Sequence, residues 1–409
     1  LLLGGRAADL LGRRRVLIAA LAVFTVASAL GGVVSDGTLL VITRFLKGAA
    51  AAFTAPAGLS IITTQFAEGP QRNRALSIYT ATGASGSSLG LVMGGLLTEL
   101  GWRWTFLLPV PIALALLLAA PRVLPRDSRV ALGRRAFDVP GALTLTAGML
   151  LLVWTVVEAP ERGWGAPETI GGFVLAAALL GGFLAIELRT RSPLVRLGIL
   201  RSGALVRANL GAMALFGAYI AFQFVMTLYL QAMNGWSPLE TALAFLPAGL
   251  LVAFGSTRIG PLVDRYGTAP LVAAGSAASA LGYALLVLRI DAVPEYAVVL
   301  LPTLLLIGVG FALGFPTLSM QATNGIADHE QGLASGLVQT SFQVGGAISL
   351  AAATAIVTAH AGGSTDPEVL VGAYRTALLV AAGVAVGGLV VALSGLARVR
   401  RPLLAGAES

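Results

Sequence analysis

The chain has 409 residues, of which 56% are hydrophobic and only 11% are charged. A soluble domain carries about a quarter charged residues, so this composition excludes a soluble enzyme, a nucleic-acid-binding protein and a disordered scaffold. The sequence contains no cysteine, which excludes disulfides, thiol catalysis and thiolate metal sites. It contains only two histidines, so we also expect no metal site, no cofactor and no catalytic residue.

Twelve apolar stretches are each long enough to cross a bilayer as a helix, which takes about 20 residues. In chain order they are residues 16–34, 39–63, 75–98, 104–121, 140–158, 169–187, 205–232, 239–257, 269–289, 296–320, 332–359 and 372–397. Lipid offers the backbone no hydrogen-bond partner, so each stretch is expected to be an α-helix. The predicted fold class is an all-α membrane protein.

The basic residues predict the orientation of these helices. If the segment before residue 16 is cytoplasmic, 21 arginines fall in cytoplasmic segments and 3 in outer connections. Three further cations, Arg44, Lys47 and Arg375, are counted within the spans, whereas Arg207 and Arg289, at the ends of spans, are counted with the adjoining segments. This asymmetry is a positive-inside signal. The net charge of +8 therefore reports topology rather than a nucleic-acid partner, and we expect both ends of the chain on the cytoplasmic side of the cell membrane.

A glycine- and arginine-rich turn precedes the first span, at residues 5–15, and has the form G-x-x-A-D-x-x-G-R-R. Its glycines permit two helices to approach closely, and its aspartate can cap a helix or pair with an arginine. A plain basic loop that obeys the positive-inside rule is the alternative. The residues to which we assign a gating role here are Gly5, Asp9, Gly12, Arg13 and Arg14.

A weaker copy of this turn occurs at residues 260–267 and contains Asp264 and Arg265. It also lies in a predicted cytoplasmic connection, so the two copies indicate an internal repeat. Together they resemble the signature loop of the major facilitator superfamily and its weaker counterpart in the second half. The resemblance implies two six-helix bundles that move against each other.

Further segments resemble motifs of the same superfamily. Residues 44–48 are similar to R-x-x-Q-G, with Lys47 in place of glutamine, and residues 102–111 are similar to W-R-W-x-F-L-I-N-x-P. Residues 90–95 are similar to the antiporter motif G-P-x-x-G-G, with Leu91 in place of proline. A stripe of small residues surrounds this motif and predicts a close helix contact that slides during transport; it consists of Gly86, Gly90, Gly94 and Gly95.

Eight predicted spans separate the two copies of the signature loop, where a twelve-span member has six. The chain therefore resembles the fourteen-span drug:proton antiporters, the multidrug and quaternary-ammonium exporters, with its first two spans missing. This predicts an N-terminal bundle over residues 1–128, two inserted spans with linkers over 129–195 and a C-terminal six-span bundle over 196–409.

The resemblance places the substrate cavity between several helices, among them 39–63, 205–232 and 296–320. Span 205–232 carries four side chains on one helical face, which suit an aromatic or cationic ligand through stacking and one hydrogen bond. They are Phe216, Tyr219, Gln223 and Met226. Packing of these rings against a neighbouring helix is the alternative.

Arg44 and Lys47 are candidates for proton coupling. A charge at the bilayer centre costs roughly 2.5–3.5 kcal/mol on insertion scales, so two cations one turn apart need partners or water. Members of the resembled family carry an aspartate in their first span, and we expect the two cations to neighbour it and tune its proton affinity. For Arg44, snorkelling to the outer interface is the alternative.

These features predict proton-driven export of hydrophobic or cationic drug-like compounds by alternating access, which would confer antibiotic resistance. The expected partners are a small-molecule substrate, protons and the lipid bilayer, and we expect a monomer. A uniporter or exporter of a specific metabolite is the nearest alternative. A membrane-embedded enzyme and a non-transporting sensor or structural partner are weaker alternatives, because the chain lacks a catalytic constellation and long loops.

Overall fold

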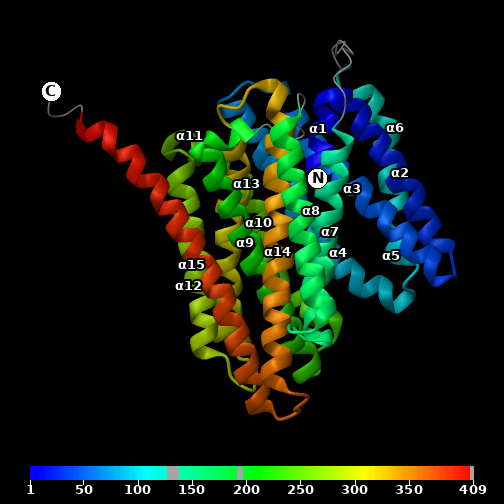
Figure 1. Cartoon of the computed structure of the whole chain (residues 1–409). Coiled ribbons are helices and arrows are strands. Elements are labelled where there is room, and N and C mark those ends of the chain that lie inside the picture. The colour runs from blue at the N-terminus through cyan, green and yellow to red at the C-terminus, as the bar shows by residue number, and fades with distance from the viewer. Residues whose placement is uncertain (127–137, 191–196, 406–409) are drawn as a thin grey trace.

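A computed structural model describes residues 1–126, 138–190 and 197–405, and within these ranges the chain is helical with no β-strand (Figure 1). The first group of helices is α1 (Leu2–Leu11), α2 (Arg13–Val33), α3 (Gly37–Gln65), α4 (Pro70–Leu100), α5 (Trp104–Leu107) and α6 (Pro109–Val123). Next come α7 (Val139–Arg162) and α8 (Pro167–Arg189). The last group is α9 (Gly203–Thr227), α10 (Pro238–Ser256), α11 (Ile259–Tyr266), α12 (Thr268–Arg289), α13 (Leu301–Thr323), α14 (Gln331–Ala361) and α15 (Pro367–Ala405).

Short irregular helices complete the chain. They are two 3₁₀ turns, η1 (Leu197–Arg201) and η4 (Asp328–Glu330), and two π-helical segments, η2 (Leu228–Met233) and η3 (Tyr296–Leu300). The π-helical segments continue α9 and precede α13, respectively, so both lie at the end of the molecule opposite α1 and α11.

The helices follow the twelve apolar stretches of the sequence, as predicted. Among the described residues, eleven helices are long and apolar enough to cross a membrane. Predicted span 75–98 lies in α4, which is 31 residues long but does not meet the same hydropathy criterion. The physical reason is its composition, because glycine and serine occupy much of its middle.

Turn chemistry determines where the helices begin. Asp36 accepts a hydrogen bond from the Leu39 amide (2.9 Å) at the start of α3, and Ser237 and Glu240 form a reciprocal capping box at the start of α10. Gly12 ends α1 with φ 100° and Gly267 ends α11 with φ 78°. Side chains disfavour this backbone region, so glycine is required at both turns.

The two copies of the signature loop adopt the same local structure. In each, a short helix carries the glycine and the aspartate, a glycine of positive φ ends it, and a long helix follows at once. The first copy is α1 leading into α2, and the second is α11 leading into α12. The internal repeat seen in the sequence is therefore also a structural repeat.

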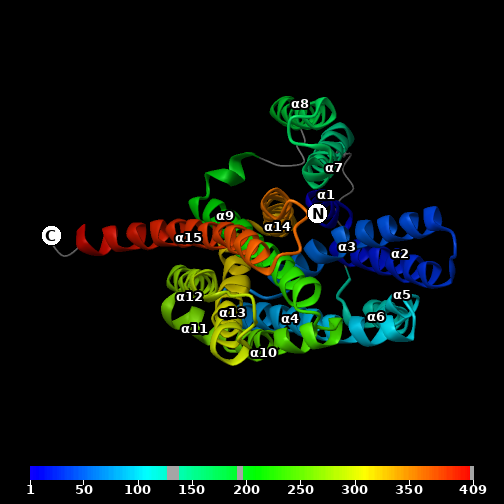
Figure 2. The ribbon, with the colours of Figure 1, turned by 90° about the horizontal axis from the view of Figure 1, so that it is seen from below.

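The helices assemble into groups that Figure 2 shows along the long axis. Helices α9, α12, α13, α14 and α15 pack together and contribute most of a large buried apolar cluster among the described residues. Helices α2, α3, α5 and α6 form a second group, and α7 and α8 form a hairpin that reaches the rest of the protein through α14. Helix α4 packs on α10, and α1 packs on α14, so each bundle contacts the other through these pairs.

The contact between α1 and α14 is made by backbone. A Cβ atom added to Gly5 would overlap the Gly332 carbonyl oxygen, and one added to Gly336 would lie 3.2 Å from the Leu1 carbonyl oxygen. Gly5, predicted to permit close helix approach, does so here. Because these glycines have no side chains, the backbones of two helices from opposite halves of the chain are in direct contact.

Replacing Gly5 by Ala is expected to force α1 away from α14. Overpacking of this kind costs about 1–3 kcal/mol, so the apparent unfolding temperature in detergent should fall by about 2–5 °C. Gly181→Ala is the matched control, because an added Cβ on this exposed α8 glycine meets no described atom within 4 Å and should leave the temperature unchanged or raise it. An equal response of both variants would contradict the contact.

Candidate functional site

The end of the molecule that carries α1 and α11 holds a set of polar contacts between the two halves, which we call the inter-bundle network. Its centre is Asp9, whose side chain is only 2% exposed. Its carboxylate accepts hydrogen bonds from the backbone amides of Gly332 and Leu333, each at 3.2 Å, in the first turn of α14. The amides and the partial positive charge of a helix N-terminus both stabilise a carboxylate there.

Arg13 links this carboxylate to two further helices. Its Nη2 donates to Asp9 Oδ1 at 3.2 Å and to the Asp328 carbonyl at 2.6 Å, and its Nε donates to Ser60 Oγ at 2.7 Å. One guanidinium therefore joins α2, α3 and the segment before α14. Arg14 acts separately, because its Nη2 donates to the Pro121 carbonyl of α6 at 2.6 Å.

The second copy of the signature loop docks on α4 in a related way. Asn73 Nδ2, in the first turn of α4, donates to Asp264 Oδ1 at 2.6 Å. A Cβ on Gly260 would lie 3.2 Å from the Arg74 amide nitrogen, so α11 and α4 also approach closely. Arg265 points elsewhere, with its guanidinium 5.2 Å from the Tyr266 ring centre.

Sequence reasoning missed two members of the network: Glu68, just before α4, and Arg72, in the first turn of α4. The Gly325 amide donates to Glu68 Oε1 at 2.7 Å. Arg72 is 2% exposed, and its Nη2 donates to the Thr323 carbonyl at 3.1 Å, at the end of α13, and lies 3.4 Å from Gln331 Oε1. Nothing in their spacing connects them to partners more than 250 residues away.

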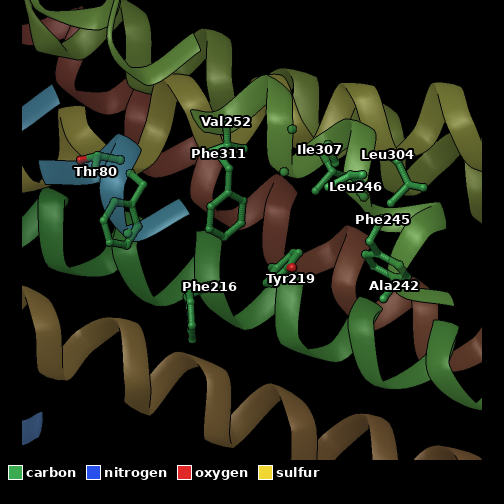
Figure 3. Close-up of a pocket in the computed structure, with 15 residues that line it drawn as sticks. Thr80, Phe216, Tyr219, Ala242, Phe245, Leu246, Val252, Leu304, Ile307 and Phe311 are labelled. Atoms are coloured by element: carbon green, nitrogen blue, oxygen red, sulfur yellow. The ribbon is translucent and has the colours of Figure 1, made fainter. Parts of the chain in front are cut away.

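Between the helices lies a cavity of about 330 Å³ lined by α4, α9, α10 and α13 (Figure 3). Along α10 its lining runs from Ala242 to Val252, and along α13 from Leu304 to Phe315. A helix rises 1.5 Å per residue, so the cavity is a slot roughly 15 Å long. Among the lining residues that the structure describes, only Thr80 and Tyr219 carry polar side chains, and none is acidic or basic.

Aromatic rings form one wall of the slot. Tyr219 and Phe311 lie with their ring centres 4.8 Å apart, and Phe216 contacts both Phe311 (6.4 Å) and Phe342 (6.0 Å). Figure 3 shows Phe216 and Tyr219 arising from α9 and Phe311 from α13. The slot is therefore suited to stack a planar apolar ligand.

Of the four residues of α9 predicted to bind substrate, the structure places two in the slot and two outside it. Phe216 and Tyr219 line the slot. Gln223 is half-buried outside the lining, and Met226 is 2% exposed within the apolar core. Phe311 and Phe315 were missed, although their spacing of four within predicted span 296–320 was a usable signal. Substrate binding by these residues stays a prediction.

The predicted glycine stripe starts at Gly86, about one turn after Gly83 on α4. Gly83 lines the slot, and an added Cβ on Gly83, Gly86 or Gly90 would meet no described atom within 4 Å. Gly95, further along α4, lies against Leu239 of α10, where a Cβ would be 3.7 Å from its Cα. In this conformation the two helices thus meet near Gly95, and the sliding role of the stripe, which includes Gly94, stays a prediction.

The two predicted coupling residues lie against one aromatic ring. Arg44 Cζ is 4.5 Å and Lys47 Nζ is 4.8 Å from the centre of the Phe106 ring. Neither side chain forms an ion pair with any residue that the structure describes. A cation–π contact contributes about 0.5–2 kcal/mol, less than the roughly 2.5–3.5 kcal/mol cost of a central charge, so Phe106 offsets only part of that cost for each cation.

Arg375, the third cation within a predicted span, has a structural partner. Its Nη2 donates to the Ile290 carbonyl at 2.8 Å, which satisfies the C-terminal end of α12. A cation at a helix C-terminus is stabilised by the negative partial charge of the last carbonyl groups, just as the positive partial charge of a helix N-terminus stabilises the Asp9 carboxylate. No group of acidic, histidine or cysteine residues suited to a metal ion occurs in the described part of the chain.

Comparisons with known proteins agree with this architecture. The sequence profile of the Major Facilitator Superfamily matches residues 1–350 and, in a second match, residues 259–407. The chain is 38% identical over 400 residues to the puromycin resistance protein of Streptomyces alboniger, covering 94% of this chain and 78% of that one. It is 36% identical over 403 residues to the cephamycin export protein of Amycolatopsis lactamdurans, covering 96% and 80%.

Solved structures show the same fold at low sequence identity. The human organic anion transporter MFSD10 superposes with a TM-score of 0.68 at 16% identity, covering 96% of this chain and 79% of that chain. The proton:xylose symporter XylE superposes with a TM-score of 0.61 at 15% identity, covering 96% and 81%.

Acid is expected to stabilise the conformation in which Asp9 is buried. Burial raises the pKa of Asp9 to about 6, against the opposing effects of Arg13 and the α14 amides. When α1 leaves α14, the carboxyl meets water and its pKa returns to about 3.9. The closed form therefore binds the proton more tightly, so its proton-linked stabilisation is complete below about pH 4 and is lost as pH rises through about 6.

The measurement uses one spin label at Leu11→Cys and one at Asn324→Cys, because the chain has no cysteine of its own. The two labels lie on opposite halves, so a short distance between them reports the conformation in which Asp9 is buried. The fraction of molecules with this short distance should rise as pH falls from 8 to 5. Asp9→Asn keeps every other titratable group and should abolish this dependence. A pH response that persists unchanged in Asp9→Asn would assign it to another group.

Proposed function

Because this chain belongs to the major facilitator superfamily, we propose that it exports hydrophobic, drug-like compounds across the cytoplasmic membrane by alternating access, driven by protons. The observation that carries this proposal is the apolar slot lined by aromatic rings, next to a polar network that joins the described residues of the two halves at one end of the molecule. A carrier needs such a combination of a central binding site and a reversible seal.

The inter-bundle network supplies the seal. Its contacts include two buried charged groups, Asp9 and Arg72, each hydrogen-bonded to backbone at a helix end of the opposite half. Hydrogen bonds to charged groups contribute about 1.5–3 kcal/mol each, so a few suffice to hold the halves together. They lie at the end predicted to be cytoplasmic, where water can replace them when the seal opens.

Relatives support the substrate class. Two proteins similar over most of the chain are named for puromycin resistance and cephamycin export. We propose that this chain likewise confers resistance by exporting an antibiotic-like compound. The slot would hold its aromatic parts, whether neutral or cationic, through stacking on Phe216, Tyr219 and Phe311.

Proton coupling is assigned to Arg44 and Lys47. Their lack of an acidic partner in the described part of the chain, and the incomplete compensation by Phe106, support a role in tuning the proton affinity of a neighbouring carboxyl. The hairpin α7–α8 between the two halves supports membership of the fourteen-span drug:proton antiporters. We propose that the transporter acts as a monomer, with both ends of the chain on the cytoplasmic side.

Leu91 favours a second candidate function. The antiporter motif that residues 90–95 resemble has proline at this position. A uniporter or exporter of one metabolite, without proton coupling, is compatible with that replacement. Efflux from inverted vesicles with and without a protonophore separates the two functions, because only the coupled exporter stops when the gradient is dissipated.

Gly83→Leu should reduce export by filling the slot. Gly83 lines the slot, and an added Cβ meets no described atom within 4 Å, so the larger side chain enters open space rather than displacing a neighbour. We expect at least a tenfold lower efflux rate for bulky aromatic compounds in vesicles, with unchanged protein yield. Gly181→Leu, on the exposed face of α8, is the control and should transport at the wild-type rate. Normal efflux in Gly83→Leu would remove the slot from the transport path.

Arg44→Ala should shift the pH dependence of efflux. Removal of a cation near a coupling carboxyl raises the pKa of that carboxyl, so the efflux profile should move to higher pH. The measurement is the initial efflux rate in vesicles between pH 5.5 and 8.5. Proton-driven efflux with an unchanged pH profile would exclude Arg44 from coupling, whereas Arg375→Ala, the structural cation, serves as the control for loss of stability.

A further inference from the structure

The described lining of the slot contains no charged side chain, and this bears on which ligands it can bind. Of the 15 lining residues that the structure describes, 13 offer only apolar side chains or glycine, and none of the 15 is ionised. A cation that leaves water for such surroundings loses its hydration without gaining a counter-charge, and aromatic faces return only part of that loss. An uncharged ligand of the same shape does not lose the hydration free energy of a charge.

The two polar side chains of the slot are not equivalent. The Thr80 hydroxyl donates to the Leu76 carbonyl of its own helix at 3.0 Å. The Tyr219 hydroxyl has no hydrogen-bond partner among the described residues, whereas those of Tyr229 and Tyr296 donate to the backbone carbonyls of Asp291 and Ala244. Figure 3 shows the Tyr219 oxygen within the group of lining side chains. It is therefore a donor available to an acceptor on the ligand.

The shape of the slot adds a third restriction. Its lining on α10 and α13 follows one face of each helix for about 15 Å, while α9 contributes rings over a single turn. An elongated, flat ligand can lie along α10 and α13 and stack on one of the rings of Tyr219 and Phe311 while its edge contacts the other, because the ring centres are 4.8 Å apart and the ring planes are tilted by 58°. An acceptor in the middle of such a ligand would face the Tyr219 hydroxyl.

We propose that the slot selects uncharged, elongated aromatic compounds that carry a hydrogen-bond acceptor, which Tyr219 recognises, and that it discriminates against permanent cations. This inference rests on the proposed function and narrows its substrate class. Residues Phe216, Phe311 and Phe315 provide stacking, and Tyr219 provides orientation.

The test uses two fluorescent three-ring compounds of nearly identical shape. N-methylacridone is neutral and carries a carbonyl acceptor, whereas N-methylacridinium is a permanent cation without one. Equilibrium binding to the purified full chain in detergent is measured for wild type, Tyr219→Phe and Tyr374→Phe. Tyr374 is the matched control because it is 3% exposed in the core and does not line the slot.

Wild type should bind the acridone at least tenfold more tightly than the acridinium. Tyr219→Phe should weaken acridone binding by about two- to tenfold, the usual effect of one hydrogen bond, and leave acridinium binding unchanged. The charge preference that remains in Tyr219→Phe measures the effect of the apolar walls alone. Tyr374→Phe should change neither affinity.

Two binding results would overturn the inference. Equal or tighter binding of the acridinium contradicts selection against charge, and unchanged acridone affinity in Tyr219→Phe contradicts recognition by the hydroxyl. Efflux from vesicles then separates this failure from a failure of the proposed function. If the chain exports the acridinium but not the acridone, the export function stands and the inference falls; if it neither binds nor exports either compound, both fall.

Discussion

The placement of the Asp9 carboxylate at the start of α14 is the interaction on which the arrangement of the two halves depends. A buried carboxylate is costly unless it is paired and hydrogen-bonded, and here two backbone amides and Arg13 meet both needs. The backbone contact of Gly5 with Gly332 brings the carboxylate within reach of those amides. Gly5 and Asp9, one turn apart on α1, therefore act together: the glycine permits the close approach, and the aspartate forms the hydrogen bonds that this approach allows.

The polar contacts described above between the halves lie at one end of the molecule, whereas the described lining of the slot at its middle has only two polar side chains. This division follows from what each region must do. Polar groups at a helix end can form hydrogen bonds with water when their contacts break, so breaking these contacts costs little free energy. Polar contacts at the middle of a bilayer would have no replacement, and an apolar slot avoids that cost in every conformation.

The sequence alone predicted most of the fold and pointed to some of the residues that the structure places in the slot and in the inter-bundle network, whereas their roles stay predictions. The limit of the sequence has a physical origin. Spans depend on local composition, and the two signature loops depend on local spacing, so both were visible in the residues. Phe216 and Tyr219 were found because one helical face can be read from one segment. Arg72 and Gln331 were not connected, because their contact joins the beginnings of two helices 259 residues apart, and no local pattern encodes such a pairing.

The two signature loops also show why the second copy can depart from the first. Asp9 binds backbone amides of α14, which are present whatever side chains α14 carries. Asp264 binds the side-chain amide of Asn73, so its contact depends on one residue of α4. The first contact also uses the positive end of a helix and an arginine, whereas the second is a single charge-assisted hydrogen bond. The contact made by Asp9 is thus the stronger part of the seal. The contact made by Asp264 requires fewer partners, which is consistent with the weaker match of the second copy to the signature loop.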